Sequence, residues 1–561
     1  MKVATDSTAR PPSTVAANSR VMAAGTLLSR LTGLARDFAL AAAIGSAVFS
    51  DLFALGNSLP NIVYILVVGG ALNAVFIPQL VRHMREDPDG GDDFADRLIT
   101  ATLLILVALT LIALACAPWI VRVYATANYN DTQLQVAVTF AWLCLPQILF
   151  YGAYTMFSQV LNSRLYFAAP AFAPIVNNIV MVATAVVFIW MTASVALVDG
   201  QAVITGAPVV VLGIGTTVGV VLQALVLIPF LRAAGYRWRP RWGFRGYGLG
   251  KAGRLALWTI GLVVVNQVGF LVVVRLATGA NILSGADGGL ALYQRALLVF
   301  MLPQSIITIS IVTAIFPRMS HNAGIGKLDT VAEQLNSGIR VVTALMTICA
   351  AYLVAFGAPL GLVFFNWYRN SAESAIYTGQ TISVFALGLI PLALFYLFLR
   401  GWYAFENTKV PFVLTVVYNA IAIPLTIGLY YAAPASGKVL ALALAYVLAY
   451  WLILPITWLS LKRRVPGMGR RREIAGIAGS MLMAAVAAFV GFMAASGVTH
   501  LRTEQFTFTV DKVTATIALL LGGLVTTCIY VALIRIFRPT DFHAALSPAL
   551  NKLPTSIRAH R

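Results

Sequence analysis

Apolar stretches of about 20 residues recur along almost the whole of this 561-residue chain, separated by short polar connections. An α-helix needs about 20 apolar residues to cross a bilayer, and in lipid every backbone polar group must be bonded within the protein. The composition agrees, because 60% of the residues are hydrophobic and 11% are charged, whereas soluble domains carry about 25% charged residues. The sequence therefore predicts an all-α polytopic membrane protein.

Fourteen helical spans are predicted from these stretches. Their approximate positions are 21–45, 49–81, 98–123, 133–161, 167–192, 208–232, 252–277, 290–317, 337–365, 378–404, 411–433, 438–461, 474–498 and 512–537. If the N-terminus lies in the cytoplasm, thirty of the 39 Lys and Arg residues fall on the inner side, six on the outer side and three within spans. Lys and Arg concentrate in cytoplasmic loops, so both termini are predicted to face the cytoplasm. The loops then account for the net charge of +19, and no nucleic-acid partner is expected.

Two parts of the chain repeat each other. Residues 140–164 and 385–409 share seven identities without a gap, and the similarity extends beyond them. The matched pairs are Phe140/Phe385, Ala141/Ala386, Pro146/Pro391, Leu149/Leu394, Phe150/Phe395, Tyr151/Tyr396, Asn162/Asn407, Pro170/Pro411 and Asn178/Asn419. Chance similarity between leucine-rich helices is the alternative, but the fixed spacing of prolines and asparagines argues against it. The repeat predicts two six-helix lobes in the same orientation with a substrate site between them, as in alternating-access transporters.

The expected domain organisation follows from this repeat. It comprises a disordered cytoplasmic tail (1–20), a first lobe (21–232), a basic cytoplasmic linker (233–251), a second lobe (252–461), a separate helix pair (474–537) and a cytoplasmic tail (538–561). Pro60, Pro146, Pro303 and Pro391 are predicted hinges, because proline frees a backbone carbonyl and bends a helix. The alternative is that these are ordinary prolines of membrane helices.

Three charged residues, Arg30, Arg36 and Asp37, interrupt the first predicted span. Each charge near the middle of a span costs about 2.5–3.5 kcal/mol on insertion scales, which favours placement in a wet cavity. Arg30 and Asp37 share a helix face, and Gly33 between them allows another helix or a ligand to approach. We expect a cationic cavity wall in which Asp37 orients an arginine, and the planar guanidinium suits a phosphate. The alternatives are a structural Arg30–Asp37 pair, which leaves Arg36 unpaired, and snorkelling to the surface.

Further polar residues are expected around this cavity. Arg295, early in the eighth span, is the candidate phosphate ligand from the opposite lobe, unless it reaches the outer interface instead. Asp51, at the outer end of the second span, is expected either to close a gate by pairing with an arginine or to cap its own helix. Asn57, Asn61 and Asn73 give the second span a polar side, which could bond a sugar or peptide group or could join helices.

The first two spans carry a pattern that resembles a known family. The pattern consists of Ser29-Arg30-x-x-Gly33-x-x-Arg36-Asp37, Ser50-Asp51-x-Phe53 and Leu59-Pro60-Asn61, with later echoes in 314–320 and 403–411. It is similar to the MurJ/MviN family of lipid II flippases, within a superfamily that includes the MATE multidrug exporters. The resemblance covers about residues 20–540, and the composition would fit an actinobacterial member. It implies fourteen helices in two lobes, with a last pair forming a groove for a lipid tail.

The resemblance also implies a function and roles for individual residues. Such a protein moves lipid II, the undecaprenyl-diphosphate-linked peptidoglycan precursor, from the cytoplasmic to the outer leaflet of the bacterial plasma membrane. Arg30 and Arg36 correspond to cavity arginines needed for transport, and Asp51 corresponds to a required acidic residue. Membrane lipids and cell-wall regulators at the cytoplasmic face are the other expected partners.

The sequence departs from the family pattern at the cavity. Many members carry two arginines and a glutamate on the second span, where this chain has Tyr64, Ile65 and Gly69. The arginine of the eighth span is also missing, with Leu298 near its place and Arg295 only a neighbour. We therefore expect helix 1 to carry more of the diphosphate binding than it does in those members.

Two other classes of function remain as alternatives. A cation-coupled MATE-type drug exporter would need buried carboxylates, and the spans contain scarcely more than Asp37. A flippase for another polyprenyl-linked glycan would share the expected site. An enzyme is not expected, because the outer loops are short and nearly free of ionisable groups. No cofactor and no metal are predicted, and coupling to the membrane potential or to a monovalent cation is left open.

Overall fold

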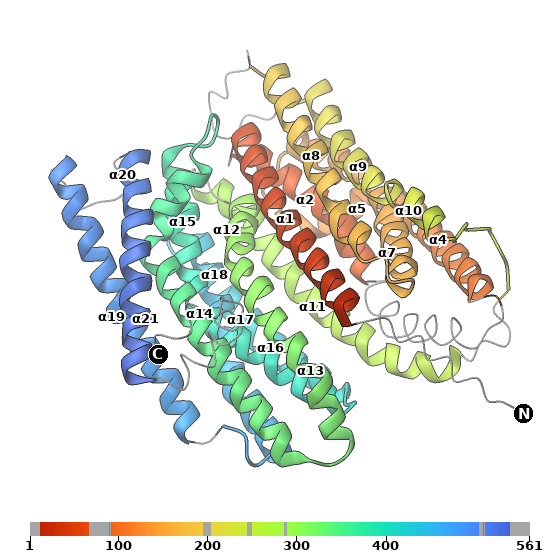
Figure 1. Ribbon diagram of the computed structural model, residues 1–561. Helices are drawn as coiled ribbons and strands as arrows, with labels where there is room; N and C mark the ends of the chain where they lie inside the picture. Colours follow the sequence, from red (N-terminus) through yellow and green to blue (C-terminus); the bar gives the residue numbers. More distant parts are fainter. Residues whose placement is uncertain are drawn as a thin grey trace, which may run out of the picture.

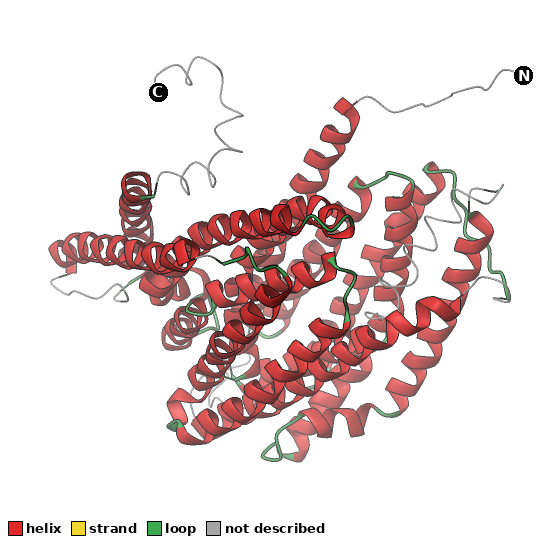
Figure 2. Cartoon of the chain, turned by 90° about the horizontal axis from the view of Figure 1, so that it is seen from below, coloured by secondary structure: helices red, strands yellow, loops and turns green. Residues whose placement is uncertain are grey.

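The computed structural model describes residues 12–45, 47–66, 89, 91–193, 204–243, 249–284, 289–469, 471–503, 509 and 511–538. Within these ranges the regular structure is helical, without a strand (Figure 2). Asn73 and Gly69, two positions of interest in the sequence, lie outside the described residues. The all-α class predicted from the apolar stretches is confirmed.

The first lobe, called the N-lobe here, consists of the helices before residue 234. They are α1 (Pro12–Ile44), α2 (Val48–Tyr64), α4 (Asp92–Ala115), α5 (Ala117–Tyr124), α6 (Asp131–Cys144), α7 (Gln147–Ser163), α8 (Ala168–Met191), α9 (Ala207–Leu225) and α10 (Leu227–Ala233). Figure 1 shows them as the red-to-yellow group. Within the lobe, α8 packs between α1 and α9, and α2 packs on α6.

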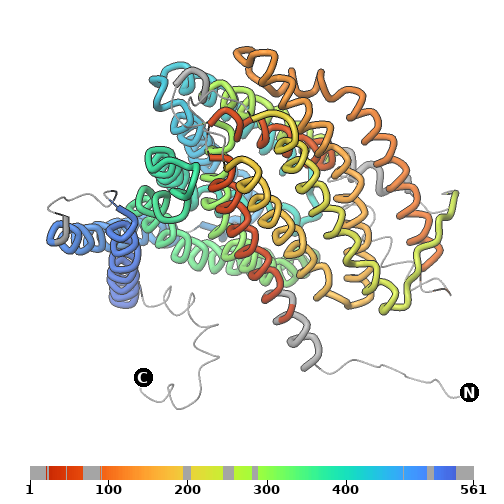
Figure 3. The backbone as a smooth tube through the Cα atoms, turned by 90° about the horizontal axis from the view of Figure 1, so that it is seen from above, coloured from red at the N-terminus to blue at the C-terminus, as the bar shows by residue number. Residues whose placement is uncertain are grey.

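The second lobe, called the C-lobe here, follows a linker. Its helices are α11 (Leu249–Ser284), α12 (Leu290–Pro303), the π-helical turn η3 (Gln304–Thr308), α13 (Ile309–Gly324), α14 (Leu328–Phe365), α15 (Ala372–Ala386), α16 (Leu389–Ala404), α17 (Lys409–Ala432), the 3₁₀ turn η4 (Ala435–Gly437) and α18 (Lys438–Arg464). The two lobes meet where α2 contacts α11 and α12, where α5 contacts α11 and where α1 contacts α14. Figures 1 and 3 show the helices of the C-lobe, in green to cyan, beside those of the N-lobe.

A last group of helices lies at the side of the C-lobe. It contains α19 (Arg471–Thr503), α20 (Lys512–Ile517), the π-helical turn η5 (Ala518–Gly522) and α21 (Gly523–Phe537). These helices pack on α14 and are far from α4 and α10 in Figure 1. The Tyr530 hydroxyl of α21 donates a hydrogen bond of 2.7 Å to the Ala344 carbonyl oxygen of α14. Among the described residues, this last group of helices therefore packs on the C-lobe.

The number of membrane spans can be compared with the prediction. Among the described residues, eleven helical segments are long and apolar enough to cross a membrane, and the bent pair α15–α16 makes a twelfth. These segments correspond to the third through fourteenth predicted spans. The first predicted span, α1, carries the charges noted above, and the second, α2, is described only as far as residue 66. The count of fourteen and the cytoplasmic location of both termini remain predictions.

The predicted hinge prolines lie at different kinds of places. Pro146 directly precedes α7 at the junction with α6, and Pro391 is in the first turn of α16, which is bent by 48° from α15. These two are equivalent in the repeat. Pro303 ends α12 and is followed by the π-helical turn η3, whereas Pro60 lies inside α2. Proline cannot donate to the preceding turn, so a break beside Pro146, Pro303 and Pro391 has a local physical cause.

The repeat recurs in the packing of the two lobes. In the N-lobe, Asn178 of α8 donates a hydrogen bond of 2.9 Å to Thr32 Oγ1 of α1. In the C-lobe, the matching Asn419 of α17 donates a hydrogen bond of 3.3 Å to Asn266 Oδ1 of α11. The fifth span of each lobe is thus tied to the first span by an asparagine at the same place.

Glycines allow α14 and α15 to pack backbone against backbone. Gly357 and Gly361 of α14 face Gly379 of α15, and this helix pair makes the most extensive contact in the C-lobe. A methyl group at Gly379 would overlap the Gly357 carbonyl oxygen. Because backbone atoms form both sides of the contact, no side chain can rotate away to make room.

We expect the substitution Gly379→Ala to destabilise the C-lobe by about 1–3 kcal/mol, the usual cost of overpacking a tight contact. The measurement is the melting temperature of the purified protein in detergent. The matched control is Gly428→Ala in α17, where an added methyl group meets nothing within 4 Å. That change should be neutral or slightly stabilising, because alanine is the better helix former. Equal melting temperatures for the two variants would contradict the packing argument.

Candidate functional site

Three neighbouring cavities lie between the two lobes, and Arg36 lines all of them. The largest has a volume of about 550 Å³ and is bounded by α1, α7, α8 and α9 of the N-lobe and by α12 and η3 of the C-lobe. A second, of about 330 Å³, extends between α2 and α11. The third, of about 220 Å³, lies between α1, α2 and α12. This is the predicted location of the site, at the interface of the lobes.

Asp37 pairs with Arg36, so the Arg30–Asp37 pair that the sequence left as an alternative is not the one in the structure. The Arg36 guanidinium donates to both carboxylate oxygens of Asp37, with Nη2 at 3.1 and 3.2 Å. Its Nη1 also donates to Asn178 Oδ1 at 3.3 Å. Seven residues separate Arg30 from Asp37 by about 10.5 Å along the axis, beyond the reach of a short aspartate. Arg36 is therefore held in place, and the structural pair leaves Arg30 rather than Arg36 without an acid.

Arg30 projects into the largest cavity. Its side chain is exposed there, and no acidic partner for it is found among the described residues. Gly33 lies one turn further along, and a methyl group at Gly33 would be 3.7 Å from Asn178 Nδ2. The missing side chain at Gly33 keeps this wall open between the two arginines. An unpaired guanidinium in a cavity inside the membrane region is available to an anion.

The asparagines of α2 lie on the second cavity. Asn57 and Asn61 both line it, together with Gln294 of α12. Gln294 also donates a hydrogen bond of 3.0 Å to Ser58 Oγ, which connects the two lobes across the cavity. Tyr64, at a place where an arginine was expected from the family pattern, bonds Thr155 Oγ1 at 2.7 Å instead. The polar side of α2 thus faces the cavity without adding positive charge.

Several cavity residues were not singled out in the sequence. Asn177 lines two of the cavities, and its Oδ1 is buried without a hydrogen-bond partner in the described part of the chain. Tyr151 lines the same two cavities and donates a hydrogen bond of 3.1 Å to Gln147 Oε1. Tyr151 belongs to the repeated segment, so the repeat was a signal for it. Asn177 had no such signal.

Asp51 links the lobes at the end of the molecule that carries the α1–α2 and α14–α15 connections. This end is predicted to be the outer one. Its carboxylate is fully buried and accepts a hydrogen bond of 2.8 Å from the Ala291 backbone N–H, in the first turn of α12. Asp51 therefore caps a helix of the opposite lobe and does not cap its own helix, which begins after Ala47. A carboxylate is favoured there by the helix dipole.

Arg295 belongs to this same closure. Its side chain is 8% exposed, and Nη2 donates a hydrogen bond of 2.6 Å to the Gly45 carbonyl oxygen at the end of α1. It also borders the smallest cavity, on the side away from Arg30. Arg295 thus lies at the contact between the lobes, at the end predicted to be the outer one, and it also lines the third cavity.

Arg369 and Arg275 make the same kind of contact. Both were counted among the six basic residues on the predicted outer side. Arg369, between α14 and α15, donates to the Thr192 carbonyl oxygen at the end of α8, and its backbone N–H donates to the Ala42 carbonyl oxygen at 3.2 Å. Arg275 of α11 donates to the Val123 carbonyl oxygen of α5 at 2.8 Å. Cations at helix C-termini satisfy carbonyls that have no partner within the helix. We call the contacts of Asp51, Arg295, Arg369 and Arg275 the outer seal.

Comparisons with known proteins match most of the chain to a single family. The family described as "Lipid II flippase MurJ" matches residues 40–532. The chain is 25% identical over 430 residues to the probable lipid II flippase MurJ of Rhizobium meliloti, covering 76% of each chain. It is 26% identical over 413 residues to the lipid II flippase MurJ of Burkholderia cenocepacia, covering 71% of this chain and 77% of that protein.

Solved structures show the same fold. A structure of lipid II flippase MurJ in an inward closed conformation has a TM-score of 0.68 at 19% identity, covering 92% of this chain and 99% of that chain. An inward-facing multidrug resistance MATE family transporter of the MOP superfamily has a TM-score of 0.63 at 14% identity, covering 78% and 94%.

The outer seal can be tested by the access of reagents to the cavity. In a cysteine-free protein carrying Asn57→Cys as the reporter, Asp51→Ala should raise labelling by a membrane-impermeant maleimide from the outer side by about tenfold. A hydrogen bond to a charged group contributes about 1.5–3 kcal/mol, and its loss shifts the closed–open equilibrium accordingly. Asp329→Ala, which removes an exposed acid from the first turn of α14, is the control. Labelling that is no faster than in the control would show that Asp51 does not hold the lobes together.

Proposed function

Because the chain belongs to the MurJ family of lipid II flippases, we propose that it carries lipid II from the cytoplasmic to the outer leaflet by alternating access. It is a multi-pass protein of the bacterial plasma membrane. The observation that carries the proposal is the pair Arg30 and Arg36, which face a cavity between two lobes within the spanning region. Guanidinium groups at that position match the diphosphate of the cargo.

The orientation follows from the distribution of basic residues. With thirty Lys and Arg on one side and six on the other, the N-terminus and the linker between the lobes lie in the cytoplasm. The outer seal then closes the extracellular end of the cavity. The largest cavity, with Arg30, lies on the cytoplasmic side of the seal and receives the cargo from the inner leaflet.

The two arginines have different roles. Asp37 and Asn178 fix the guanidinium of Arg36, so that it is positioned before the cargo arrives. Arg30 has no such partner among the described residues, and it closes on the diphosphate as the cargo enters. Together, Arg30, Arg36 and Asp37 carry one net positive charge. The diphosphate of the cargo reverses the sign of this charge. Leu298 borders two of the cavities, so the C-lobe wall contributes an apolar side chain where other members have an arginine.

Release to the outside requires the outer seal to open. Opening breaks the hydrogen bonds to helix ends of the opposite lobe that Arg295, Arg369 and Asp51 make. Water then bonds the groups that are released. The polar side chains Asn57, Asn61 and Gln294 then face the opening and bond the sugar or peptide of the cargo. Pro146, Pro303 and Pro391 stand at helix breaks where the lobes can bend.

The lipid tail is proposed to stay beside α14, α19 and α21. These helices expose large apolar side chains to the membrane, including Leu482, Phe489 and Leu524, and pack on the C-lobe through a small cluster around Met483 and Tyr530. A polyprenyl chain fits an apolar groove open to lipid better than a polar cavity. The flippase therefore moves the polar headgroup through the protein while the tail remains in the bilayer.

A MATE-type exporter is the second class of function, and the cavity chemistry argues against it. Among the described residues that line the cavities, the single acidic side chain is Asp37, which is paired with Arg36. An organic cation would find no free carboxylate there. Dye efflux driven by Na⁺ or H⁺ and insensitive to loss of Arg30 would favour the exporter.

We expect Arg30→Ala to reduce lipid II translocation by at least about tenfold, because a charge-assisted bond to the diphosphate contributes about 1.5–3 kcal/mol. Arg30→Lys should retain part of the activity, since it keeps the charge and loses the planar fork. The measurement is the appearance of lipid II in the outer leaflet of cells whose only flippase is the variant. Arg463→Ala, at the exposed end of α18, is the control for loss of a positive charge. Normal translocation by a well-inserted Arg30→Ala protein would refute the cavity assignment.

The return of the empty cavity is proposed to use the membrane potential. One net positive charge is worth about 2.3 kcal/mol per 100 mV, so an inside-negative potential of about 100 mV should speed a rate-limiting return by up to about 50-fold. Proteoliposomes with a K⁺ diffusion potential and labelled lipid II provide the measurement. Asp37→Asn raises the net charge and should steepen the dependence on potential. If the transport rate depends on a Na⁺ gradient and not on the membrane potential, the return is coupled to a monovalent cation instead.

A further inference from the structure

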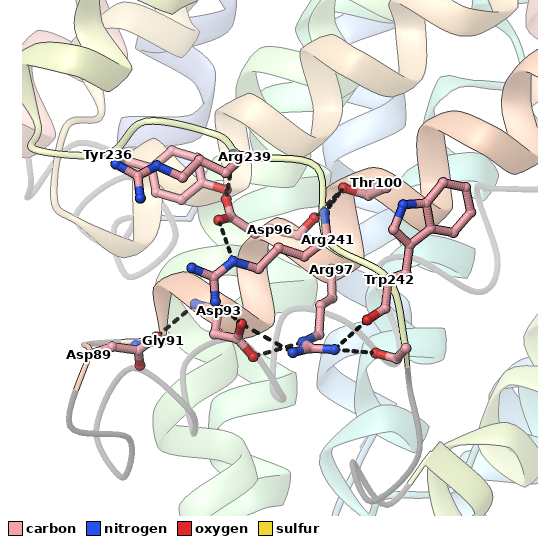
Figure 4. A network of polar contacts seen from close by, with 11 residues as sticks. Asp89, Gly91, Asp93, Asp96, Arg97, Thr100, Tyr236, Arg239, Arg241 and Trp242 are labelled. Carbon is pink, nitrogen blue, oxygen red and sulfur yellow. Dashed lines mark hydrogen bonds and ion pairs between the residues drawn. The ribbon is translucent and has the colours of Figure 1, made fainter.

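The first part of the linker between the lobes is docked on the side of α4. Residues 234–243, called the docked linker here, follow α10 and run along the beginning of α4 (Figure 4). The Tyr236 hydroxyl and the Arg239 backbone N–H both donate to Asp96 Oδ1, at 2.7 and 3.1 Å. The Arg241 backbone N–H donates to Thr100 Oγ1 at 3.2 Å. Burial raises the pKa of Tyr236, so the phenol stays a proton donor to Asp96.

These contacts place the docked linker at the depth of the lipid headgroups. They reach from the first turn of α4 to Thr100, which lies about 12 Å along the helix from Asp92. The helix α4 is among the most apolar spans of the chain. The headgroup region on each side of a bilayer is about 5–8 Å thick. The third predicted span begins at about residue 98, so the contacts with Thr100 lie at the predicted membrane boundary.

Asp92, Asp93 and Asp96 of α4 already have cationic partners. Asp92 pairs with Arg164, Asp93 pairs with Arg97 and Arg241, and Asp96 lies 3.7 Å from Arg241 Nε. The side chains of Arg237 and Arg239 take no part in these ion pairs. Both are exposed, and neither has an acidic partner within the described part of the chain.

The docked linker also exposes two indole rings beside these arginines. Trp242 is 73% exposed, although Arg97 donates to its carbonyl oxygen and so fixes its backbone. Trp238 is 38% exposed, and its indole N–H donates to Thr100 Oγ1 at 3.3 Å. An exposed tryptophan on a fixed backbone presents a large apolar surface with a polar edge. Tryptophan has this role where proteins meet the membrane–water interface.

We propose that the docked linker binds anionic phospholipid headgroups of the inner leaflet. Arg237 and Arg239 pair with lipid phosphates, and Trp242 enters the interface beside them. The proposal rests on the orientation argued above and not on the identity of the cargo. The contact anchors the linker at its N-lobe end, so the N-lobe keeps a fixed position relative to the membrane surface while the C-lobe moves.

The test uses the fluorescence of Trp242 in the full-length protein. The signal of Trp242 is the difference in fluorescence intensity between the natural protein and the Trp242→Phe variant. This substitution keeps the backbone contact with Arg97. The protein is placed in nanodiscs of phosphatidylcholine that contain a fixed fraction of brominated phosphatidylglycerol or of brominated phosphatidylcholine. Each Arg near the surface gives about a fivefold preference for anionic lipid. Brominated phosphatidylglycerol should therefore quench Trp242 several-fold more than brominated phosphatidylcholine.

The double variant Arg237→Gln/Arg239→Gln should make the two lipids quench equally. Both side chains are exposed, so folding should not change, and the melting temperature checks this. The control Lys462→Gln/Arg463→Gln removes the same charge at the end of α18 and should keep the preference for phosphatidylglycerol. Equal quenching by both lipids in the natural protein would overturn the proposal. So would a Trp242 that neither lipid quenches but that aqueous iodide reaches, because the docked linker would then lie in water.

Discussion

A guanidinium group within a bilayer is stable only where water or a strong acceptor meets it, and this constraint organises the molecule. The chain satisfies it in two ways. Arg30 and Arg36 face a polar cavity, whereas Arg295 and Arg369 donate to carbonyl oxygens at the ends of helices in the opposite lobe. The first solution makes a site for an anion. The second makes a closure, because each such arginine joins the two lobes.

The two lobes have the same helix contact at matching positions, but they differ in the charge placed there. Asn178 and Asn419 tie the fifth span of each lobe to its first span, yet Arg36 joins only the N-lobe contact. The corresponding region of the C-lobe has a cavity of about 180 Å³ lined by tyrosines such as Tyr418 and Tyr446. In the proposed function, an anionic cargo is therefore held mainly by the N-lobe. The C-lobe wall, with Gln294 and Leu298, can move past the cargo without first breaking an ion pair to it.

Much of the fold could be predicted from the sequence, because the length of the apolar stretches and the internal repeat are visible in the order of the residues. The position of Arg30 and Arg36 at the cavity was predicted from charge within a span, and that of Asn57 from the polar side of the second span. The partner of Asp37 was not, because a helical projection ignores the length and flexibility of an arginine side chain. The roles of Arg275 and Arg369 could not be predicted, since their acceptors are backbone carbonyls of distant helices that no sequence pattern marks.

The chemistry of the outer seal suits a transporter that must open repeatedly. When the lobes separate, water replaces each acceptor and donor, so the net contribution of one charged hydrogen bond is about 1.5–3 kcal/mol rather than its much larger value in an apolar medium. A few such bonds hold the closed state by several kcal/mol. Binding of a cargo can shift an equilibrium of that size, since about 5.5 kcal/mol of differential affinity moves a population from 1:99 to 99:1. An apolar contact as extensive as that between α14 and α15 would lock the lobes together.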